Sequence, residues 1–280
     1  MPVAQNIGGV GDPTGPDSWF KSLPVITKYW FGASLVVTLA VNFQVIPGGQ
    51  IVFFWDAIQS KFEVWRLLTC FLYVGKFEFN TLIALMLLVQ FSERYEKGGP
   101  FNTGAGGGTA DYAFMMMLLM TFTLLSYPLM MFVAPIPPIF ARNMIYGVLY
   151  TWSKRNPTSQ ASIWGIPVPS IYLPFAYIAM TVFMGGAYMD MLHGMAVAHL
   201  YYFLVDVVPQ VQGKDFLVTP QFLIDQFGVG QYQAPAPAAA APAAGRPNMG
   251  GLGGQTAAAP AAASSGGHSW GSGGQRLGRD

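Results

Sequence analysis

Apolar residues form long runs along most of this chain, and short polar stretches rich in glycine and proline separate them. Runs of this kind indicate membrane-spanning helices, because the ~30 Å hydrocarbon core of a bilayer asks for ~20 apolar residues. We predict six spans, at residues 25–46, 80–91, 112–133, 139–152, 171–187 and 189–208. Only the first and third comfortably reach that length, so the shorter spans must be covered within a bundle or thin the local bilayer.

The connecting segments differ in character. Residues 51–77 mix aromatic and charged side chains, which predicts a long amphipathic first loop half sunk at the membrane surface. Residues 92–111 and 152–162 are polar and contain glycine or proline, so we predict flexible aqueous loops there. Residues 229–268 are an Ala/Pro/Gly tract without large apolar side chains, which predicts a disordered linker.

Composition agrees with lipid as the solvent, because only 10% of the residues are charged and 52% are hydrophobic, against ~25% charged in soluble domains. The net charge of +1 and the lack of a basic stripe predict no nucleic-acid partner. A single cysteine, Cys70, excludes an internal disulfide. We expect no cleaved signal peptide, and the distribution of lysine and arginine favours both termini in the cytosol.

Chemistry-bearing residues are few. No phosphate-binding loop is present, and the histidines have neither the spacing nor the cysteine partners of a metal site, so we predict no cofactor and no metal. His193 and His199 point about 120° apart on a helix, and we expect each to be hydrogen-bonded within the bundle. Asp190 is expected at the start of the sixth span, where a carboxylate complements the helix dipole.

The order and spacing of several segments resemble the derlins, a branch of the rhomboid superfamily. The resemblance runs from about residue 17 to residue 228 and rests on YWFGASLVVTL, WRLLTCFLYVG, QFSERYE, YGVLYTWSKRNP and AHLYYFLVDVVP. It implies an all-α membrane protein, a rhomboid-like bundle of six transmembrane helices with an amphipathic first loop and a disordered C-terminal tail. Four regions follow: a cytosolic N-terminal segment (1–20), the rhomboid-like membrane domain (21–228), the linker (229–268) and a terminal motif (269–280).

Active rhomboids carry a serine in a G-x-S motif on the fourth span and a histidine in H-x-x-G-x-x-x-G on the sixth. On the most natural register, Leu149 takes the nucleophile position and Met191 the position of the base. His193 points about 200° away from Met191, and His199 lies ~12 Å further along the helix axis than that residue. The resemblance therefore implies a pseudoprotease without a catalytic site.

Two motifs of the bundle remain as structural candidates. Gly194 and Ala198, four residues apart, predict a smooth helix face that another helix can approach closely. The family usually has glycine at the second position. For Trp65 and Arg66 two interpretations stay open. The pair either anchors the loop in the interface, with the arginine reaching headgroups, or seats the first loop against the bundle, as in the family.

The last twelve residues resemble the SHP box by which adaptors bind the valosin-containing-protein AAA+ ATPase. An aromatic side chain and a leucine flank a glycine-rich stretch, and two such anchors on an extended backbone can dock into a groove. Ser272 stands where a glycine is common. The residues assigned to this ATPase-binding tail are Trp270, Gly271, Gly273, Gly274, Arg276 and Leu277.

The resemblance implies a non-catalytic part of endoplasmic-reticulum-associated degradation that resides in the endoplasmic reticulum membrane. It would bind misfolded lumenal and membrane proteins, thin the lipid bilayer, recruit the ATPase and join an ER ubiquitin-ligase complex during retrotranslocation to the cytosol. An active intramembrane protease is one alternative. A small-solute channel or transporter is another, although no internal repeat is visible. The sequence leaves open whether the protein forms homo- or hetero-oligomers.

Overall fold

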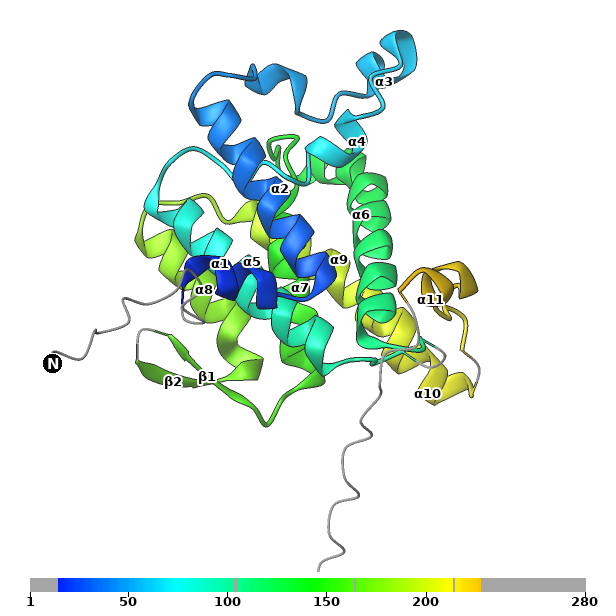
Figure 1. Cartoon of the computed structure of the whole chain (residues 1–280). Helices are drawn as coiled ribbons and strands as arrows, with labels where there is room; N and C mark the ends of the chain where they lie inside the picture. Colours follow the sequence, from blue (N-terminus) through cyan, green and yellow to red (C-terminus); the bar gives the residue numbers. More distant parts are fainter. Residues whose placement is uncertain (1–14, 103–104, 164, 214, 228–280) are drawn as a thin grey trace, which may run out of the picture. The chain divides into compact units, whose positions relative to one another are not determined.

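The computed structural model describes residues 15–102, 105–163, 165–213 and 215–227. Each of the six apolar runs contains most or all of its residues in a helix (Figure 1). These helices are α2 (Val25–Asn42), α5 (Phe79–Gly98), α6 (Gly108–Val133), α7 (Ala141–Arg155), α8 (Leu173–Phe183) and α9 (Met189–Tyr202). Helix α9 continues through η3 (Phe203–Val207), a π-helical turn, into α10 (Val208–Gln212).

Three helices are long and apolar enough to cross a membrane: Val25–Asn42, Gly108–Val133 and Met189–Gln212. The described part of the chain is therefore a mostly helical membrane bundle, while the count of six spans stays a prediction. Helices α7 and α8 have 15 and 11 residues, so they rise only ~23 Å and ~17 Å.

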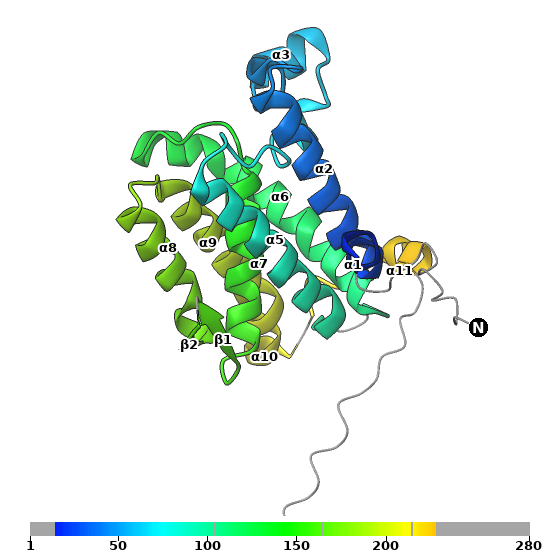
Figure 2. The same ribbon diagram turned by 60° about the vertical axis from the view of Figure 1, so that its left-hand side comes forward.

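Helix α7 lies in the middle of the bundle and contacts α5, α6, α8 and α9 (Figure 2). Its residues are buried from Asn143 through Ser153, although the helix contains asparagine, threonine and serine as well as apolar side chains. Burial on all sides is possible because these polar groups bond locally, as Thr151 does to the carbonyl of Gly147 and Ser153 to that of Tyr150.

The first loop joins α2 to α5 at one end of the bundle, which we call the first-loop end. It contains η1 (Gly48–Gln50), α3 (Trp55–Lys61) and α4 (Arg66–Thr69). The opposite end carries a hairpin of β1 (Gln160–Ile163) and β2 (Ile166–Pro169), antiparallel with Gln160 opposite Pro169, and we call it the hairpin end. The remaining elements are α1 (Pro16–Ser22), η2 (Ser170–Tyr172) and α11 (Gln221–Phe227).

Both predicted aqueous loops contain more structure than their composition indicated. Residues 92–98 form the last turns of α5, because Ser92, Tyr95 and Glu96 are buried against neighbouring helices and bonded to them. Residues 108–111 open α6, and residues 152–155 close α7. The hairpin begins at Gln160, near the end of the second predicted loop, and adds a short β element to the helical fold.

Candidate functional site

Helices α7 and α9 approach each other closely at Gly194. A Cβ atom at this position would lie 2.2 Å from the carbonyl oxygen of Asn143 and 2.7 Å from its Cα atom. One turn further, a Cβ atom at Gly147 would lie 3.7 Å from the Cβ atom of Ala198. The structure thus places Gly194 and Ala198 on the face of α9 that meets α7, with their α7 neighbours Asn143 and Gly147.

The same contacts fix the register between the two helices. Asn143 meets Gly194 and Gly147 meets Ala198, so α7 and α9 run parallel and in step. Leu149 comes six residues after Asn143, whereas Met191 comes three residues before Gly194. Their levels therefore differ by ~13 Å along the bundle. The structure does not bring the two motif-assigned positions together, so that pairing of nucleophile and base positions is wrong.

His193 is buried between three helices. Its Nε2 atom lies 2.7 Å from Oγ of Ser126 on α6, and its Nδ1 atom lies 2.8 Å from Nδ2 of Asn143 on α7. Serine, histidine and asparagine in this order resemble a nucleophile, a base and a group that orients the base. No local pattern marks Ser126 as a partner of His193, because the serine lies 67 residues away from the histidine in an apolar run.

The proton arrangement of this cluster opposes nucleophilic catalysis. With the amide of Asn143 donating to Nδ1, the ring proton is on Nε2 and points at Ser126. The serine hydroxyl then donates to the carbonyl oxygen of Phe122, 2.7 Å away within α6. Ser126 also lies inside a continuous helix, where backbone N–H groups are engaged and cannot form an oxyanion hole. The cluster therefore joins α6, α7 and α9 through hydrogen bonds, while Oδ1 of Asn143 has no partner among the described residues.

His199 also has a partner within the bundle. Its Nδ1 atom lies 2.7 Å from the hydroxyl oxygen of Tyr150 on α7, and the two rings meet edge to face with their centroids 5.9 Å apart. Both histidines of α9 are thus hydrogen-bonded to α6 or α7, as the sequence predicted. Among the described residues no group of three His, Cys, Asp or Glu side chains could hold a metal ion.

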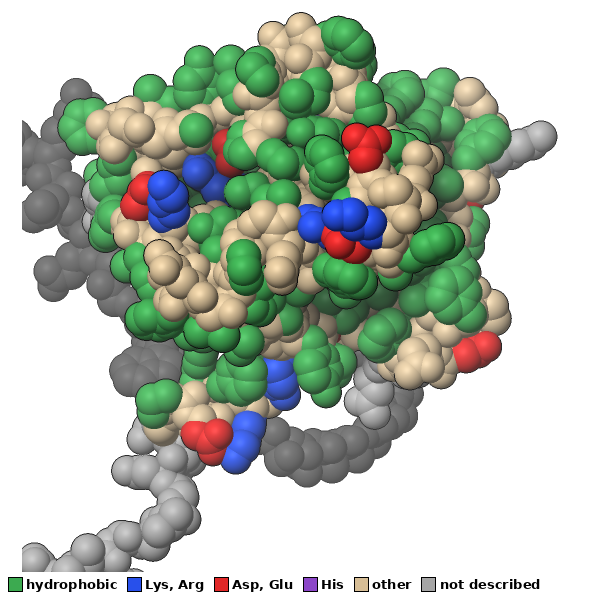
Figure 3. All heavy atoms as spheres, turned by 90° about the horizontal axis from the view of Figure 1, so that it is seen from above, with side chains coloured by type: hydrophobic (Ala, Val, Ile, Leu, Met, Phe, Trp, Pro, Cys, Tyr) green, Lys and Arg blue, Asp and Glu red, His purple; other side chains and the backbone are tan. Residues whose placement is uncertain are grey.

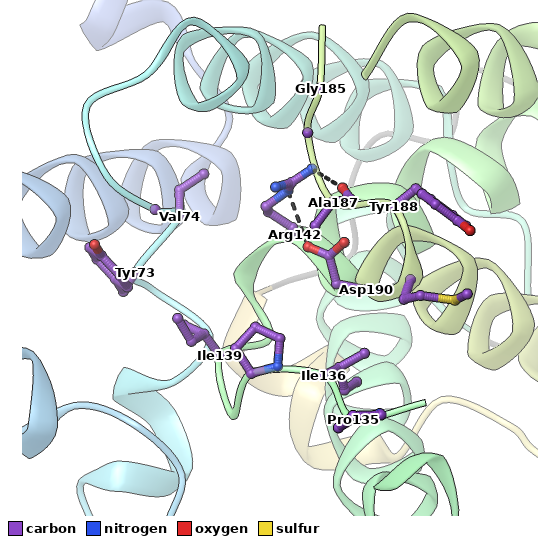
Figure 4. A pocket seen from close by; sticks show the side chains of 14 residues that line it. Tyr73, Val74, Pro135, Ile136, Ile139, Arg142, Gly185, Ala187, Tyr188 and Asp190 are labelled. Carbon is purple, nitrogen blue, oxygen red and sulfur yellow. Dashed lines mark hydrogen bonds and ion pairs between the residues drawn. The ribbon is translucent and has the colours of Figure 1, made fainter. Parts of the chain in front are cut away.

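A pocket of about 540 Å³ opens at the first-loop end, where α7 and α9 begin (Figure 4). Three segments of the chain supply its walls: residues 73–75, residues 135–139 and residues 185–190. Arg142 and Asp190 form an ion pair in it, with Nε 3.2 Å from Oδ2. Arg142 Nη2 also donates to the carbonyl oxygen of Ala187, at 3.1 Å. Oδ1 of Asp190 accepts the N–H of Met191, as expected for a carboxylate at a helix start.

The first loop is cross-linked by Arg66. The side chain is buried, and its Nη1 atom donates to the carbonyl oxygens of Gly49 and Val52, at 2.6 and 2.9 Å. Its Nε atom pairs with Glu63 at 2.5 Å. Arg66 therefore ties α4 to the start of the loop and does not reach outward, whereas Trp65 beside it is 52% exposed.

Many large apolar side chains of the first-loop end are exposed. Figure 3 looks onto this end and shows apolar side chains over much of it, with several charged groups among them. The exposed residues of the loop are Phe54, Trp55, Phe62, Val64, Trp65, Leu68 and Phe77. A surface of this kind is unfavourable in water and suits the interfacial region of a bilayer.

The hairpin end contains two buried polar networks that sequence reasoning missed. Glu96 accepts the N–H groups of Ile26 and Thr27, at 3.1 and 2.9 Å, and so caps α2, whose own N-cap Pro24 has no side-chain acceptor. The carboxylate of Asp206 in η3 pairs with Arg155 at 2.7 Å.

Arg155 also donates to the hydroxyl of Tyr95 and lies against the rings of Tyr95 and Tyr201. In the sequence, Glu96 and Asp206 are visible as acidic residues beside apolar runs, but their partners are distant along the chain. The predicted ATPase-binding residues, from Trp270 to Leu277, lie outside the described residues.

Comparison with known proteins agrees with this architecture. A model of the Der1-like family matches residues 23–221, which include α2 through α10. Derlin-1 of Homo sapiens is 33% identical over 213 residues, 73% of this chain and 80% of that protein. Derlin-1.1 of Zea mays is 32% identical over 233 residues, 80% of this chain and 90% of that protein. Derlin-1 of Arabidopsis thaliana is 31% identical over 211 residues, with coverage of 75% and 76%. This chain is thus a member of the Der1-like family, the derlins.

Proposed function

We propose that this derlin acts in endoplasmic-reticulum-associated degradation as a non-catalytic membrane component that helps misfolded proteins reach the cytosol. The observation that carries the proposal is the family match over residues 23–221, which covers helices α2 through α10. In this proposal the protein is a multi-pass component of the endoplasmic reticulum membrane with both termini cytosolic. The hairpin end then faces the cytosol and the first-loop end faces the lumen.

Membrane thinning is the physical part of this proposal. Helices α7 and α8 are shorter than the ~30 Å hydrocarbon core, and the exposed apolar loop favours immersion at one membrane surface. A thinner bilayer lowers the free energy needed to move unsatisfied peptide groups across the membrane. Bilayer thinning supplies no energy for moving the client. In this proposal the pulling force comes from the AAA+ ATPase recruited by residues 269–280. An ER ubiquitin-ligase complex is the proposed partner that modifies the client.

Deletion of residues 269–280 tests the recruitment step. The expected result is loss of ATPase co-purification and slower turnover of a misfolded membrane client in cells that depend on this protein. A second variant keeps the tail length and replaces only Trp270 and Leu277 by alanine, which removes the two apolar anchors, leaves the glycines and should also lose recruitment. Undiminished recruitment by both variants would refute the tail as the ATPase site.

An intramembrane serine protease is the second candidate, and the cluster of Ser126, His193 and Asn143 is the observation that favours it. The test is labelling of the purified protein with a fluorophosphonate probe, with Ser126→Ala as the control. We expect no labelling of either protein, because the serine hydroxyl is bonded to a helix carbonyl and lacks an oxyanion site. Labelling that disappears in the Ser126→Ala variant would establish the protease.

A further inference from the structure

The pocket at the first-loop end contains a guanidinium group with unused donors. Nε of Arg142 faces Asp190 in the ion pair without a hydrogen bond, and Nη2 donates to the carbonyl oxygen of Ala187. Its Nη1 group has no hydrogen-bond acceptor within the part of the chain that the structure describes. Figure 4 shows the arginine and its two partners among the pocket-lining side chains, with apolar residues on the facing walls. A cavity of about 540 Å³ is within the usual range for ligand sites, roughly 300–1,000 Å³.

We propose that this pocket binds an extended segment of an unfolded polypeptide and that Arg142 Nη1 donates to one of its main-chain carbonyl oxygens. The inference rests on the proposed function in degradation and adds to it the binding site and the chemistry of recognition. Asp190 holds the guanidinium in place. The carboxylate also offers lone pairs to a main-chain N–H group of the bound segment.

Charge favours a polypeptide over an anionic ligand. Arg142 and Asp190 neutralise each other, so the paired site carries no net charge and matches a neutral peptide group. A lipid phosphate that approached Arg142 would meet the carboxylate of Asp190 about one hydrogen-bond length further on. The first turns of α7 and α9 point their N–H groups at this end, which adds a weak preference for acceptors such as carbonyl oxygens.

The apolar walls suit the side chains of an extended segment. Val74, Ile136, Ile139 and Tyr188 line the pocket around the ion pair. Side chains of an extended chain alternate between two faces, so apolar ones can contact these walls while the main chain faces Arg142. The ion pair and the apolar walls together select for a segment that exposes both its backbone and its apolar side chains. Misfolded proteins expose such segments, whereas folded proteins rarely do.

Peptide binding to the purified full-length protein in lipid nanodiscs tests the proposal. The probe is a fluorescein-labelled, unstructured, uncharged peptide capped at both ends, followed by fluorescence anisotropy. Arg142→Gln removes the free donors and should raise Kd about 10-fold, as expected for one hydrogen bond to a charged group. The matched control is Lys76→Gln, the same change at an exposed lysine near the pocket, with an effect below about twofold.

A second variant keeps the ion pair intact in case Arg142→Gln unfolds the protein. Ile139→Trp fills the pocket and should also raise Kd about 10-fold or more, since it blocks the binding volume. Its control is Ile171→Trp at the hairpin end, where the side chain is 39% exposed. Native folding of each variant is checked by the temperature at which the buried Cys70 becomes reactive.

The outcomes separate this inference from the proposed function. An unchanged Kd in both Arg142→Gln and Ile139→Trp overturns the peptide site. Displacement of the probe by short-chain phosphatidylserine but not by unlabelled peptide also overturns it and assigns the pocket to a lipid headgroup. Client turnover that depends on the protein, together with an unchanged Kd, leaves the function standing without this site. Client turnover that is independent of the protein refutes the function, whatever the peptide affinity.

Discussion

Replacement of Gly194 by alanine should loosen the contact between α7 and α9. The added Cβ atom would lie 2.2 Å from the carbonyl oxygen of Asn143, while ordinary contacts begin at 3.4 Å. The obstacle is backbone, so the two helices must separate by about 1 Å. Overpacking of this kind costs about 1–3 kcal/mol, and the separation also stretches the hydrogen bond between Asn143 and His193, worth about 1 kcal/mol.

The higher helix propensity of alanine offsets about 1 kcal/mol of this loss. The net loss of about 1–3 kcal/mol corresponds to a fall in the unfolding temperature of about 2–12 °C for a chain of this size.

The single cysteine supplies the assay. Cys70 is fully buried, so a thiol-reactive maleimide dye reports unfolding of the detergent-solubilised protein as the temperature rises. Gly147→Ala is the matched control on the facing helix. Its Cβ atom would lie 3.3 Å from the end of the flexible Leu119 side chain and 3.6 Å from the nearest backbone oxygen. This variant should shift the unfolding temperature by less than about 2 °C. Equal unfolding temperatures for the two variants would refute the close approach at Gly194.

Three further predictions use the same preparation. Glu96→Gln should destabilise the protein by about 1–2 kcal/mol, because α2 loses a charged cap. The control Glu93→Gln, at a more exposed ion pair, should cost less than about 0.5 kcal/mol by the same Cys70 assay, and equal losses would contradict the capping role. Arg66→Ala should speed chymotrypsin cleavage of the first loop several-fold, unlike Lys61→Ala at an exposed position, and equal cleavage rates would contradict the cross-linking role. Burial raises the pKa of Cys70 to about 12 from 9.0. At pH 8 the folded protein should therefore alkylate about a thousandfold more slowly than the denatured chain, and comparable rates would show that the thiol is accessible.

The local pattern of apolar residues was enough to predict the helices of this protein, because their positions depend on hydrophobicity alone. Each of the six apolar runs is mostly helical, because a run of apolar residues must satisfy its backbone internally and bury its side chains in lipid or protein. The helix ends were less accurate, since α5 extends through polar residues 92–98. Those residues are helical because Glu96 and Ser92 have partners on α2 and α6, which no local pattern reveals.

The pattern of residues along the chain was sufficient for the helical membrane class, the family and the small-residue face of α9. Which polar groups meet could be seen only in the folded bundle. It placed Ser126 beside His193, Arg142 beside Asp190 and Asp206 beside Arg155, all far apart in the chain. It also showed that Leu149 and Met191 lie at different levels of α7 and α9. The physical reason is that hydrophobic periodicity specifies which residues avoid water, whereas pairing between polar groups depends on helix register and crossing, which are set by the packing of the whole bundle.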